Sequence, residues 1–227
     1  DVGYSFSENI KIYGNIGYTY RVPTFTDLYY IGSNEIGNPN LKPESALAEE
    51  IGFSYKLNNL SFDIAFFNRK SDNLIDWTKD NEDDAKWEAR NFSEVITRGF
   101  ETNFNFNFKI SNTNQNIKLS YNYISDDIKD TNANYTRYSL NSLKHQLTTT
   151  LNFEYSSKIS QQINFRYVER TNGENYNVLD TKLMAKINSK LMMSISANNI
   201  FNTNYSETNL VPMPKGNGMI GLKYNIY

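Results

Sequence analysis

Residues 21–55 read RVPTFTDLYYIGSNEIGNPNLKPESALAEEIGFSY and decide the fold of this chain. They follow a segment of alternating apolar and polar residues at 10–20 and end in a second such segment at 47–57. Each proline between the two segments removes a backbone donor and fixes φ, so a sheet ladder cannot continue through it. The stretch therefore predicts a long irregular excursion that joins two antiparallel strands.

The same alternation continues along the rest of the chain. Side chains that repeat with period two indicate β-strands whose two faces meet different surroundings. We predict about ten antiparallel strands, preceded by a strand end near residues 3–6. The predicted strands cover residues 10–20, 47–57, 60–66, 96–108, 117–123, 147–155, 163–167, 179–187, 191–197 and 220–226.

Short and long connections alternate between these strands. The short turns fall at 7–9, 58–59, 111–115, 156–158 and 188–190, and the long loops at 21–43, 78–88, 126–141, 170–176 and 201–215. Transmembrane β-barrels place short turns on one side of the membrane and longer loops on the other. The predicted fold is therefore an all-β, antiparallel transmembrane barrel, since a soluble sandwich has no reason to sort its loops by length.

Composition agrees with this fold and excludes several other classes. Aromatic residues make up 15% of the chain, which suits the aromatic girdles of a membrane barrel. No run of eighteen or more apolar residues is present, so no transmembrane helix is expected. The chain has no cysteine, which excludes disulfides and thiolate metal sites, and its net charge of −2 argues against a nucleic-acid partner.

The two faces of the predicted strands receive different roles. The Ile, Leu, Phe and Tyr face must meet lipid, and the opposite face must line a polar interior. The alternative fold is a soluble β-sandwich, in which the polar face would be solvated. The residues predicted to face the interior or a plug within it include Arg21, Glu50, Asp63, Glu101, Arg166, Asp180 and Lys182.

Several phrases of the sequence resemble one family. Residues 21–30 and 37–44 closely resemble two sequence motifs of the TonB-dependent outer-membrane receptors, in the same order and at the same spacing. The resemblance is strongest to the vitamin B12 and catecholate-siderophore receptors. The Arg-Gly-Phe-Glu at 98–101 and the Asn-Ile-Phe-Asn-x-x-Tyr at 199–205 resemble further phrases of that family. The C-terminus resembles the signal that the barrel-assembly machinery reads, through Gly221, Tyr224, Ile226 and Tyr227.

The resemblance implies what part of such a receptor the chain represents. Residues 1–227 are expected to form the C-terminal part of a twenty-two-stranded barrel in the bacterial outer membrane. The plug domain, the TonB box, the first barrel strands and a signal peptide are expected to lie outside this sequence. Outer-membrane lipid and the barrel-assembly machinery are implied as partners.

The resemblance also implies a function. The whole receptor would bind a scarce nutrient, preferably cobalamin and otherwise a ferric siderophore, and import it with energy transmitted by TonB through the plug. Flat aromatic side chains in the outer loops suit such ligands. The candidates are Tyr29, Tyr30, Trp77, Trp87, Tyr135, Tyr138 and Tyr205.

Enzymatic and metal sites are weaker interpretations of the sequence. His145 is the only histidine, and Ser139 and Ser142 lie near it, but strand spacing makes a nucleophile–base pair a coincidence. The acidic run at 80–84 offers oxygen ligands for calcium but lacks the pattern of a calcium loop, so we expect no catalytic residue, cofactor or metal beyond a possible loop-bound calcium. A self-contained small barrel, acting as a porin or an outer-membrane enzyme, and a soluble sandwich remain the alternatives.

Overall fold

The computed structural model describes residues 1–91, 94–129, 134–137, 143–207 and 211–226. Within these ranges the chain is almost entirely strand, with one short helix, α1 (Phe25–Tyr29). The strands form an eleven-stranded sheet and a separate four-stranded sheet. The fold class predicted from the alternating sequence is confirmed.

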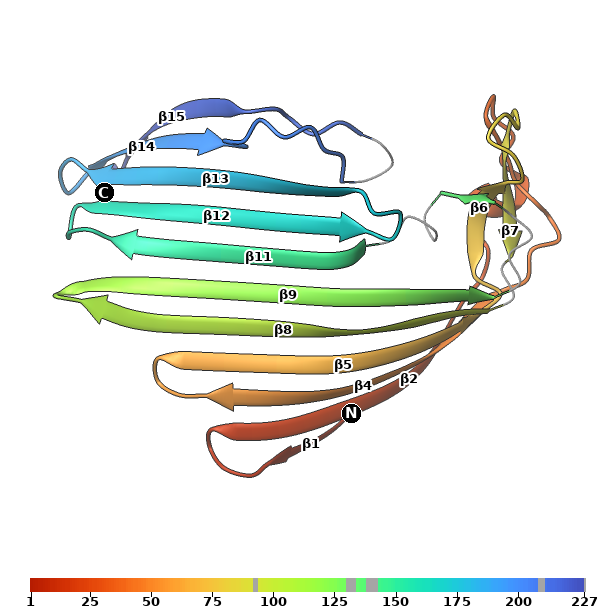
Figure 1. Ribbon diagram of the computed structural model, residues 1–227, viewed down its shortest axis with the longest axis horizontal. Coiled ribbons are helices and arrows are strands. Elements are labelled where there is room, and N and C mark those ends of the chain that lie inside the picture. Colours follow the sequence, from red (N-terminus) through yellow and green to blue (C-terminus); the bar gives the residue numbers. More distant parts are fainter. Residues whose placement is uncertain (92–93, 130–133, 138–142, 208–210, 227) are drawn as a thin grey trace.

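The large sheet is antiparallel throughout and follows the order of the chain, β1-β2-β4-β5-β8-β9-β11-β12-β13-β14-β15 (Figure 1). It contains the ten predicted strands and the predicted strand end. Its strands are β1 (Val2–Ser5), β2 (Ile10–Arg21), β4 (Glu44–Lys56), β5 (Leu60–Asp72), β8 (Glu94–Ile110), β9 (Thr113–Lys129), β11 (Leu143–Glu154), β12 (Ile159–Arg170), β13 (Asn175–Lys186), β14 (Leu191–Asn198) and β15 (Asn217–Tyr224).

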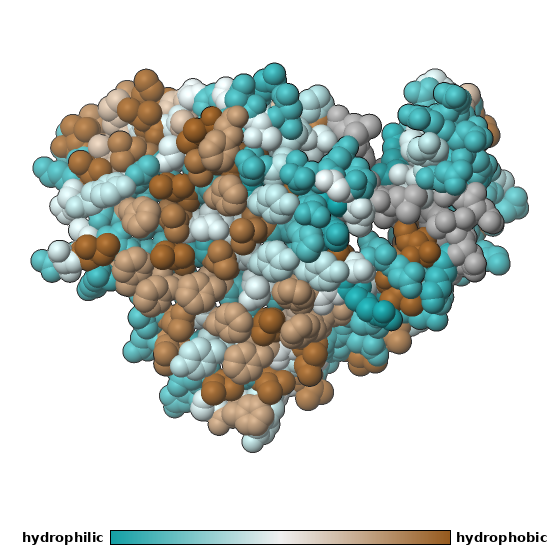
Figure 2. Space-filling view, in the orientation of Figure 1, coloured by the Kyte–Doolittle hydropathy of each residue, from teal (hydrophilic) through white to brown (hydrophobic). Residues whose placement is uncertain are grey.

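One face of the large sheet is apolar and open. Ile16, Tyr18 and Ile220 are 66%, 70% and 73% exposed, although such side chains are normally buried in a water-soluble domain. Figure 2 shows hydrophobic residues spread over the strands of the large sheet. The described residues place no second layer over this face, so the soluble-sandwich alternative is wrong, and the face suits lipid.

The apolar belt on this face ends at a sharp boundary on the side of the long loops. Phe66, Phe100 and Tyr123 are register partners across β5, β8 and β9, and their neighbouring rings lie 5.9 Å apart. The belt on β8 covers residues 100–108, about the 9–11 residues that a tilted strand needs to cross a bilayer. The next partner row on the same face is polar, with Arg98 donating to Asn68. We call this side of the boundary the rim.

Strands β5, β8 and β9 continue well past this boundary into the rim. Their last rows on the outer face are charged, and Glu94 pairs with both Lys70 and Lys129, at 2.8 and 3.5 Å. The predicted loop at 126–141 is therefore wrong at its start, because β9 extends to Lys129. Charges on both faces remove the apolar alternation there, which made the end of the strand read as a loop.

The four-stranded sheet is built from segments that the sequence placed in loops. It has the order β10-β6-β7-β3, with β3 (Glu35–Ile36), β6 (Ile75–Lys79), β7 (Trp87–Asn91) and β10 (Tyr135–Thr136). We call it the loop sheet, and Figure 1 shows it at the long-loop end of the large sheet. The prediction of plain loops at 21–43 and 78–88 is corrected: the first contains α1 and β3, and the second belongs to the β6–β7 hairpin.

The loop sheet has a small core of its own. Ile75, Trp77, Thr78 and Ala89 are 9% exposed or less. Asn91 ties the hairpin to the first long loop, since its side chain accepts from the Lys42 backbone N–H at 2.8 Å and donates to the Lys42 carbonyl at 3.0 Å. Three loops far apart in sequence thus form one folded unit.

Residues 21–44 contain a set of hydrogen bonds that joins the loop sheet to the large sheet. Arg21 donates two hydrogen bonds to the Glu44 carboxylate, at 2.7 and 2.8 Å, and a third to Asp27 at 3.1 Å. Asp27 also caps α1, because it accepts from the Thr24 N–H and Thr24 Oγ1 accepts from the Asp27 N–H. Arg21, Thr24 and Asp27, which belong to the motif at 21–30, therefore hold the first long loop against the strands that flank it.

The remaining alternatives concern how the sheet meets the membrane. The large sheet runs from β1 to β15 without a pairing between these two strands in the described part of the chain, so it is open. A closed, self-contained small barrel is therefore not what these residues form. None of the described helical residues makes a helix long and apolar enough to cross a membrane.

Candidate functional site

The polar face of the large sheet carries all the side chains that the sequence assigned to an interior. The strand register places these residues on the face opposite to the apolar belt: Arg21, Glu50, Asp63, Glu101, Arg166, Asp180 and Lys182. Their distribution is uneven. The acids Glu50, Asp63 and Glu101 lie on β4, β5 and β8, whereas β13 and β15 carry Lys182, Lys186 and Lys223. Their contact with a plug stays a prediction.

The three acids of the first group gather around Tyr13. Glu50, Asp63 and Glu101 all interact electrostatically with the Tyr13 side chain. Glu50 accepts from Asn15 Nδ2 at 3.1 Å, and Asp63 accepts from the Ser54 hydroxyl at 2.5 Å. This wall of the sheet therefore carries a group of three carboxylates, with Lys11, Lys56 and Arg69 on the same face of the strands.

The Tyr13 ring lies flat against this wall because its cross-strand partner is glycine. Gly52 is opposite Tyr13 in the register, and a Cβ at Gly52 would overlap the ring. A glycine in a strand often marks such a close approach. The ring therefore lies along the strands beside the three acids, of which Glu101 is exposed and Glu50 and Asp63 are half-buried.

A second cluster lies where the polar face meets the long loops. The Tyr176 and Tyr205 rings are 4.7 Å apart, and the Arg166 guanidinium lies 6.0 and 5.6 Å from their centroids. Arg166 also pairs with Glu207 at 2.5 Å. Cations over tyrosine faces are attracted by the ring quadrupole. The cluster combines a flat aromatic surface with a guanidinium, which suits a planar ligand that carries negative charge or acceptors.

This cluster borders an open cavity of about 400 Å³. Arg170 forms part of the cavity wall and donates to the Glu207 carbonyl at 2.7 Å. The other lining residues come from the start of β13 and from the last long loop: Glu174, Asn175, Tyr176, Asn204, Tyr205, Ser206 and Pro212. The Arg170 side chain and two phenol rings thus line one hollow on the rim, and Arg166 lies beside those rings. We call this hollow the tyrosine pocket.

The structure separates the predicted loop aromatics into different settings. Tyr205 lies in the tyrosine pocket, Tyr29 and Tyr30 are exposed on and after α1, and Tyr135 is exposed on β10. The Trp87 ring is near two cations, with its centroid 5.3 Å from Lys79 Nζ and 5.9 Å from Arg137 Cζ. Ligand contact by these residues stays a prediction.

Trp77 and Tyr138 need separate statements. Trp77 is 9% exposed and pairs with Ala89 inside the loop sheet, so its burial points to packing instead of ligand contact. A tryptophan in a polar loop gave no sign that the loop would fold on it. Tyr138 lies outside the described residues.

Sequence reasoning missed several residues of the tyrosine pocket. Tyr176 was assigned to a loop, although it is the second residue of β13 and faces the polar side beside Val168. Arg170 is the last residue of β12 and Glu207 lies within the last long loop, and neither belongs to a local motif. The alternation along the strand could have indicated Tyr176, because it is an even number of residues from Asp180 and Lys182 and therefore faces the same polar side.

The acidic run is held by protein partners. Arg90 donates to both carboxylate oxygens of Asp80, at 2.7 and 3.1 Å, and this bond lowers the pKa of Asp80 below its ordinary value. The Asn81 and Asp80 backbone N–H groups donate to Asp84 and lower its pKa too. No group of metal-binding side chains is found in the described residues, and a loop-bound calcium stays a prediction.

The remaining predicted residues lie on the large sheet or beyond its end. His145 faces the apolar side, with its Nδ1 2.8 Å from the Tyr121 hydroxyl and its ring 5.0 Å from that of Tyr123, which is a position in an aromatic girdle. Gly221 and Tyr224 belong to β15, and Ile226 follows that strand. Tyr227, Ser139 and Ser142 lie outside the described residues.

Comparison with known proteins assigns the family. Residues 1–206 match the model of the TonB dependent receptor-like β-barrel. The chain is 31% identical to the vitamin B12 transporter BtuB of Vibrio vulnificus strain YJ016 over 100 residues, which are 44% of this chain and 16% of that protein. It is 35% identical to BtuB of Photobacterium profundum over 100 residues, 43% of this chain and 16% of that protein.

Solved structures share the fold at low identity. The ferric-catecholate import receptor Fiu of E. coli K12 matches 98% of this chain with a TM-score of 0.72 and 20% identity. The copper transporter OprC matches 98% with a TM-score of 0.76 and 13% identity. The chain covers only 34% and 37% of these two proteins. It therefore belongs to the TonB-dependent receptor β-barrel family of the bacterial outer membrane.

Proposed function

We propose that this chain is the C-terminal barrel portion of an outer-membrane receptor that imports cobalamin with energy transmitted by TonB. The rim would bind the nutrient, a plug outside this sequence would block the interior, and TonB would pull on that plug. The energy would come from the proton gradient of the inner membrane and be transmitted by TonB, so the barrel itself would need no catalytic group. As in the sequence prediction, the barrel-assembly machinery and outer-membrane lipid are its further partners.

The tyrosine pocket carries the proposal. It lies at the long-loop end and is lined by the rings of Tyr176 and Tyr205, over which the Arg166 guanidinium lies. Ligand sites characteristically combine flat apolar surface with a few convergent polar groups. Cobalamin is preferred because vitamin B12 transporters are the relatives at 31–35% identity.

A ferric catecholate is the second candidate ligand. Arg166 and Arg170 place two cations beside the tyrosine rings, and a catecholate complex offers negative charge together with aromatic faces. Cobalamin has no comparable anionic rings. Glu207 already offsets part of the positive charge of Arg166, so the guanidinium groups favour the ferric chelate only in part, whereas the sequence relatives favour cobalamin.

Binding to the complete receptor distinguishes the two ligands. Equilibrium titrations with cyanocobalamin and with a ferric tris-catecholate are expected to give saturable binding of cyanocobalamin alone. Tyr205→Ala should weaken that binding about tenfold, the loss that corresponds to roughly 1.4 kcal/mol. Tyr155→Ala is the matched control, because Tyr155 is 58% exposed at a short turn on the opposite end of the sheet.

Uptake tests the rest of the proposal. Cells that contain the complete receptor should accumulate the bound nutrient only when TonB is present. Uptake that continues without TonB would point to passive diffusion through a porin and would contradict the proposal. If only the ferric catecholate shows saturable binding, the proposed ligand changes from cobalamin to that chelate, and the proposed transport mechanism is unaffected.

A further inference from the structure

A part of the polar face differs in chemistry from the walls beside it. It comprises the polar-face positions of β8 at 103–107, β9 at 116–122, β11 at 146–152 and β12 at 160–164. Apart from Lys118, every one of these positions carries a neutral amide or hydroxyl. We call this area the neutral panel.

Several side chains of the neutral panel hydrogen-bond to one another. Asn116 donates to Asn105 and Asn107 at 2.7 and 2.8 Å, and accepts from Asn152 at 3.0 Å. Ser120 donates to Asn103 at 2.7 Å. Buried or half-buried polar groups that are already paired offer little to a new partner without exchanging a bond. A segment that packs against the panel is therefore held weakly.

The walls on either side of the panel are charged. The acidic group of Glu50, Asp63 and Glu101 borders it on the side of β5, and Arg166, Asp180 and Lys182 border it on the side of β13. Hydrogen bonds to ionised groups are roughly twice as strong as neutral ones. A plug held inside the barrel would therefore be fixed by the two charged walls and least by the neutral panel between them.

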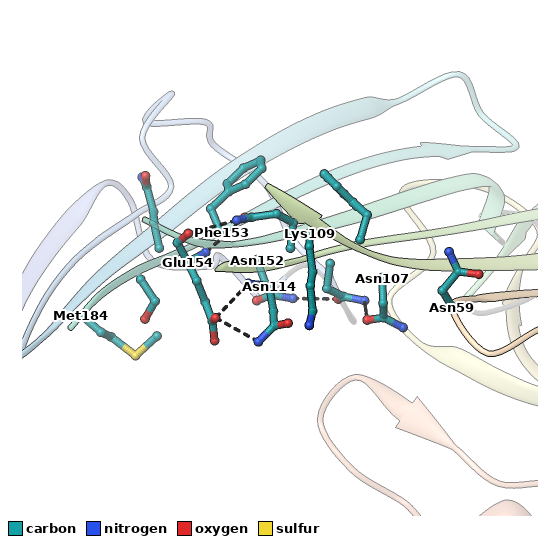
Figure 3. Close-up of a pocket in the computed structure, with 13 residues that line it drawn as sticks. Asn59, Asn107, Lys109, Asn114, Asn152, Phe153, Glu154 and Met184 are labelled. Atoms are coloured by element: carbon teal, nitrogen blue, oxygen red, sulfur yellow. Dashed lines mark hydrogen bonds between the residues drawn. The ribbon is translucent and has the colours of Figure 1, made fainter. Parts of the chain in front are cut away.

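An independent feature lies at the short-turn end of the panel. A cavity of about 650 Å³ opens there, next to Asn107, Asn116 and Asn152. Figure 3 shows Asn107, Asn114 and Asn152 on one side of the strands, together with Lys109 and Glu154, while Phe153 points to the other side. The panel thus runs along the polar face and reaches a cavity at the short-turn end of the strands.

We propose that the imported nutrient passes along the neutral panel, in a gap that opens between this wall and the displaced plug. The inference rests on the proposed function and adds the route. Conduction requires contacts that are favourable but weak and repeated. Apart from Lys118, the panel presents neutral amides and hydroxyls that must exchange a bond with one another for a bond to a passing solute. It would therefore hold a hydrophilic solute weakly at each row.

The test compares two inward-facing serines. Ser120 lies in the panel, and Ser196 lies on β14 beyond the charged wall, opposite Lys182 and Met219. Both are half-buried, and this chain has no cysteine. Ser120→Cys and Ser196→Cys would each be made in a cysteine-free complete receptor and treated with a bulky maleimide after assembly in cells, so that folding precedes the obstruction.

Two readouts are measured on each variant. The first is the rate of maleimide reaction with and without TonB energisation, which does not depend on knowing the nutrient. The second is binding and uptake of radiolabelled cyanocobalamin by the modified receptor. For Ser120→Cys we expect the reaction rate to rise with energisation and the modification to reduce uptake about tenfold, equivalent to a barrier higher by roughly 1.4 kcal/mol, with binding affinity unchanged. Ser196→Cys should show neither effect.

The possible outcomes separate the route from the function. Equal effects at both serines, an effect at Ser196→Cys alone, or no effect at either one while TonB-dependent uptake persists would each overturn the proposed route. Absence of TonB-dependent uptake in the unmodified receptor would contradict the proposed function itself, and the route with it. Loss of binding after modification of Ser120→Cys would also count against the route, because it would place Ser120 at the binding site.

Discussion

The large sheet is antiparallel throughout and the loop sheet has one parallel pair, yet the main difference between them is what surrounds their side chains. The large sheet exposes its apolar side chains and depends on lipid to cover them. The loop sheet buries Ile75, Trp77 and Ala89 within itself and adds ion pairs such as Arg137–Glu35, at 3.0 Å. The chain thus combines a sheet that faces lipid with a small sheet that faces water, and we expect the two sheets to unfold independently.

The largest expected effect is on the loop sheet. Trp77→Ala removes the largest buried apolar side chain of that sheet and should destabilise it by about 3–5 kcal/mol, as for other buried Trp truncations. Trp87 is the second and last tryptophan of the chain and also lies in the loop sheet. Its fluorescence spectrum should shift toward that of an exposed tryptophan, and proteases should cleave the loops faster.

The large sheet should not respond to this change. Its folded fraction is read from the electrophoretic mobility of unheated receptor in detergent, which differs between folded and unfolded barrels. Trp77→Ala should leave this fraction unchanged. A loss of the folded band would mean that the loop sheet and the large sheet form a single cooperative unit.

The converse change targets the apolar belt. Leu119→Arg places a charge on the apolar face of β9, in the row of Phe104 and Thr149, and should cost about 2–4 kcal/mol if that row lies at the bilayer midplane. Assembly into the membrane should fall sharply. Yield of the heat-modifiable folded form in lipid vesicles measures the effect, and Trp fluorescence of the folded fraction should stay normal.

Ile96→Arg is the matched control. Ile96 lies on the same outer face, but in the rim between Lys70 and Asp127, where a charge should cost only about 0–1 kcal/mol. Equal losses for the two variants would show that the membrane boundary does not run at the row of Phe66, Phe100 and Tyr123.

The sequence predicted the large sheet well because lipid imposes a simple pattern. Between the short turns and the belt boundary, each residue is either apolar or polar by its position, as at Phe104 and Asn105. That alternation is lost beyond the boundary, where both faces of β9 meet water and Asp126, Asp127 and Lys129 read as a loop. The strands were found, but their rim ends were not.

The loop sheet and the tyrosine pocket could not be predicted in the same way. Strand β3 has two residues and pairs in parallel with β7, from a distant loop, so no local pattern announces it. In the pocket, Arg166 and Tyr205 were each predicted for separate roles, but their contact depends on the path of the last long loop. Such contacts are set by loop packing, which a periodicity does not encode.

A smaller effect is expected from the ion pair across the loop sheet. Arg137→Met removes the bond to Glu35 and the cation over the Trp87 ring, which are partly exposed and together should contribute about 1 kcal/mol. Trp87 fluorescence during urea titration should report an earlier transition of the loop sheet. Lys70→Met removes a comparable ion pair from the large sheet and should leave that transition unchanged, unless the two sheets are coupled.

The smallest expected effect is a pH dependence confined to the loop sheet. Arg90 lowers the pKa of Asp80, so the folded loop binds a proton less readily than the unfolded chain does. A depressed carboxyl pKa stabilises the folded state above the unfolded value, near 3.9, and this contribution disappears as the pH falls through the folded value. Stability of the loop sheet, followed by Trp fluorescence from pH 7 to about pH 3, should therefore decline below about pH 4. Asp80→Asn should flatten that decline, and high salt should weaken it because the pair is exposed. A decline of equal size in Asp80→Asn would assign the acid sensitivity to other carboxyls, first to Asp84, whose pKa the Asn81 and Asp80 backbone N–H groups lower in the same direction.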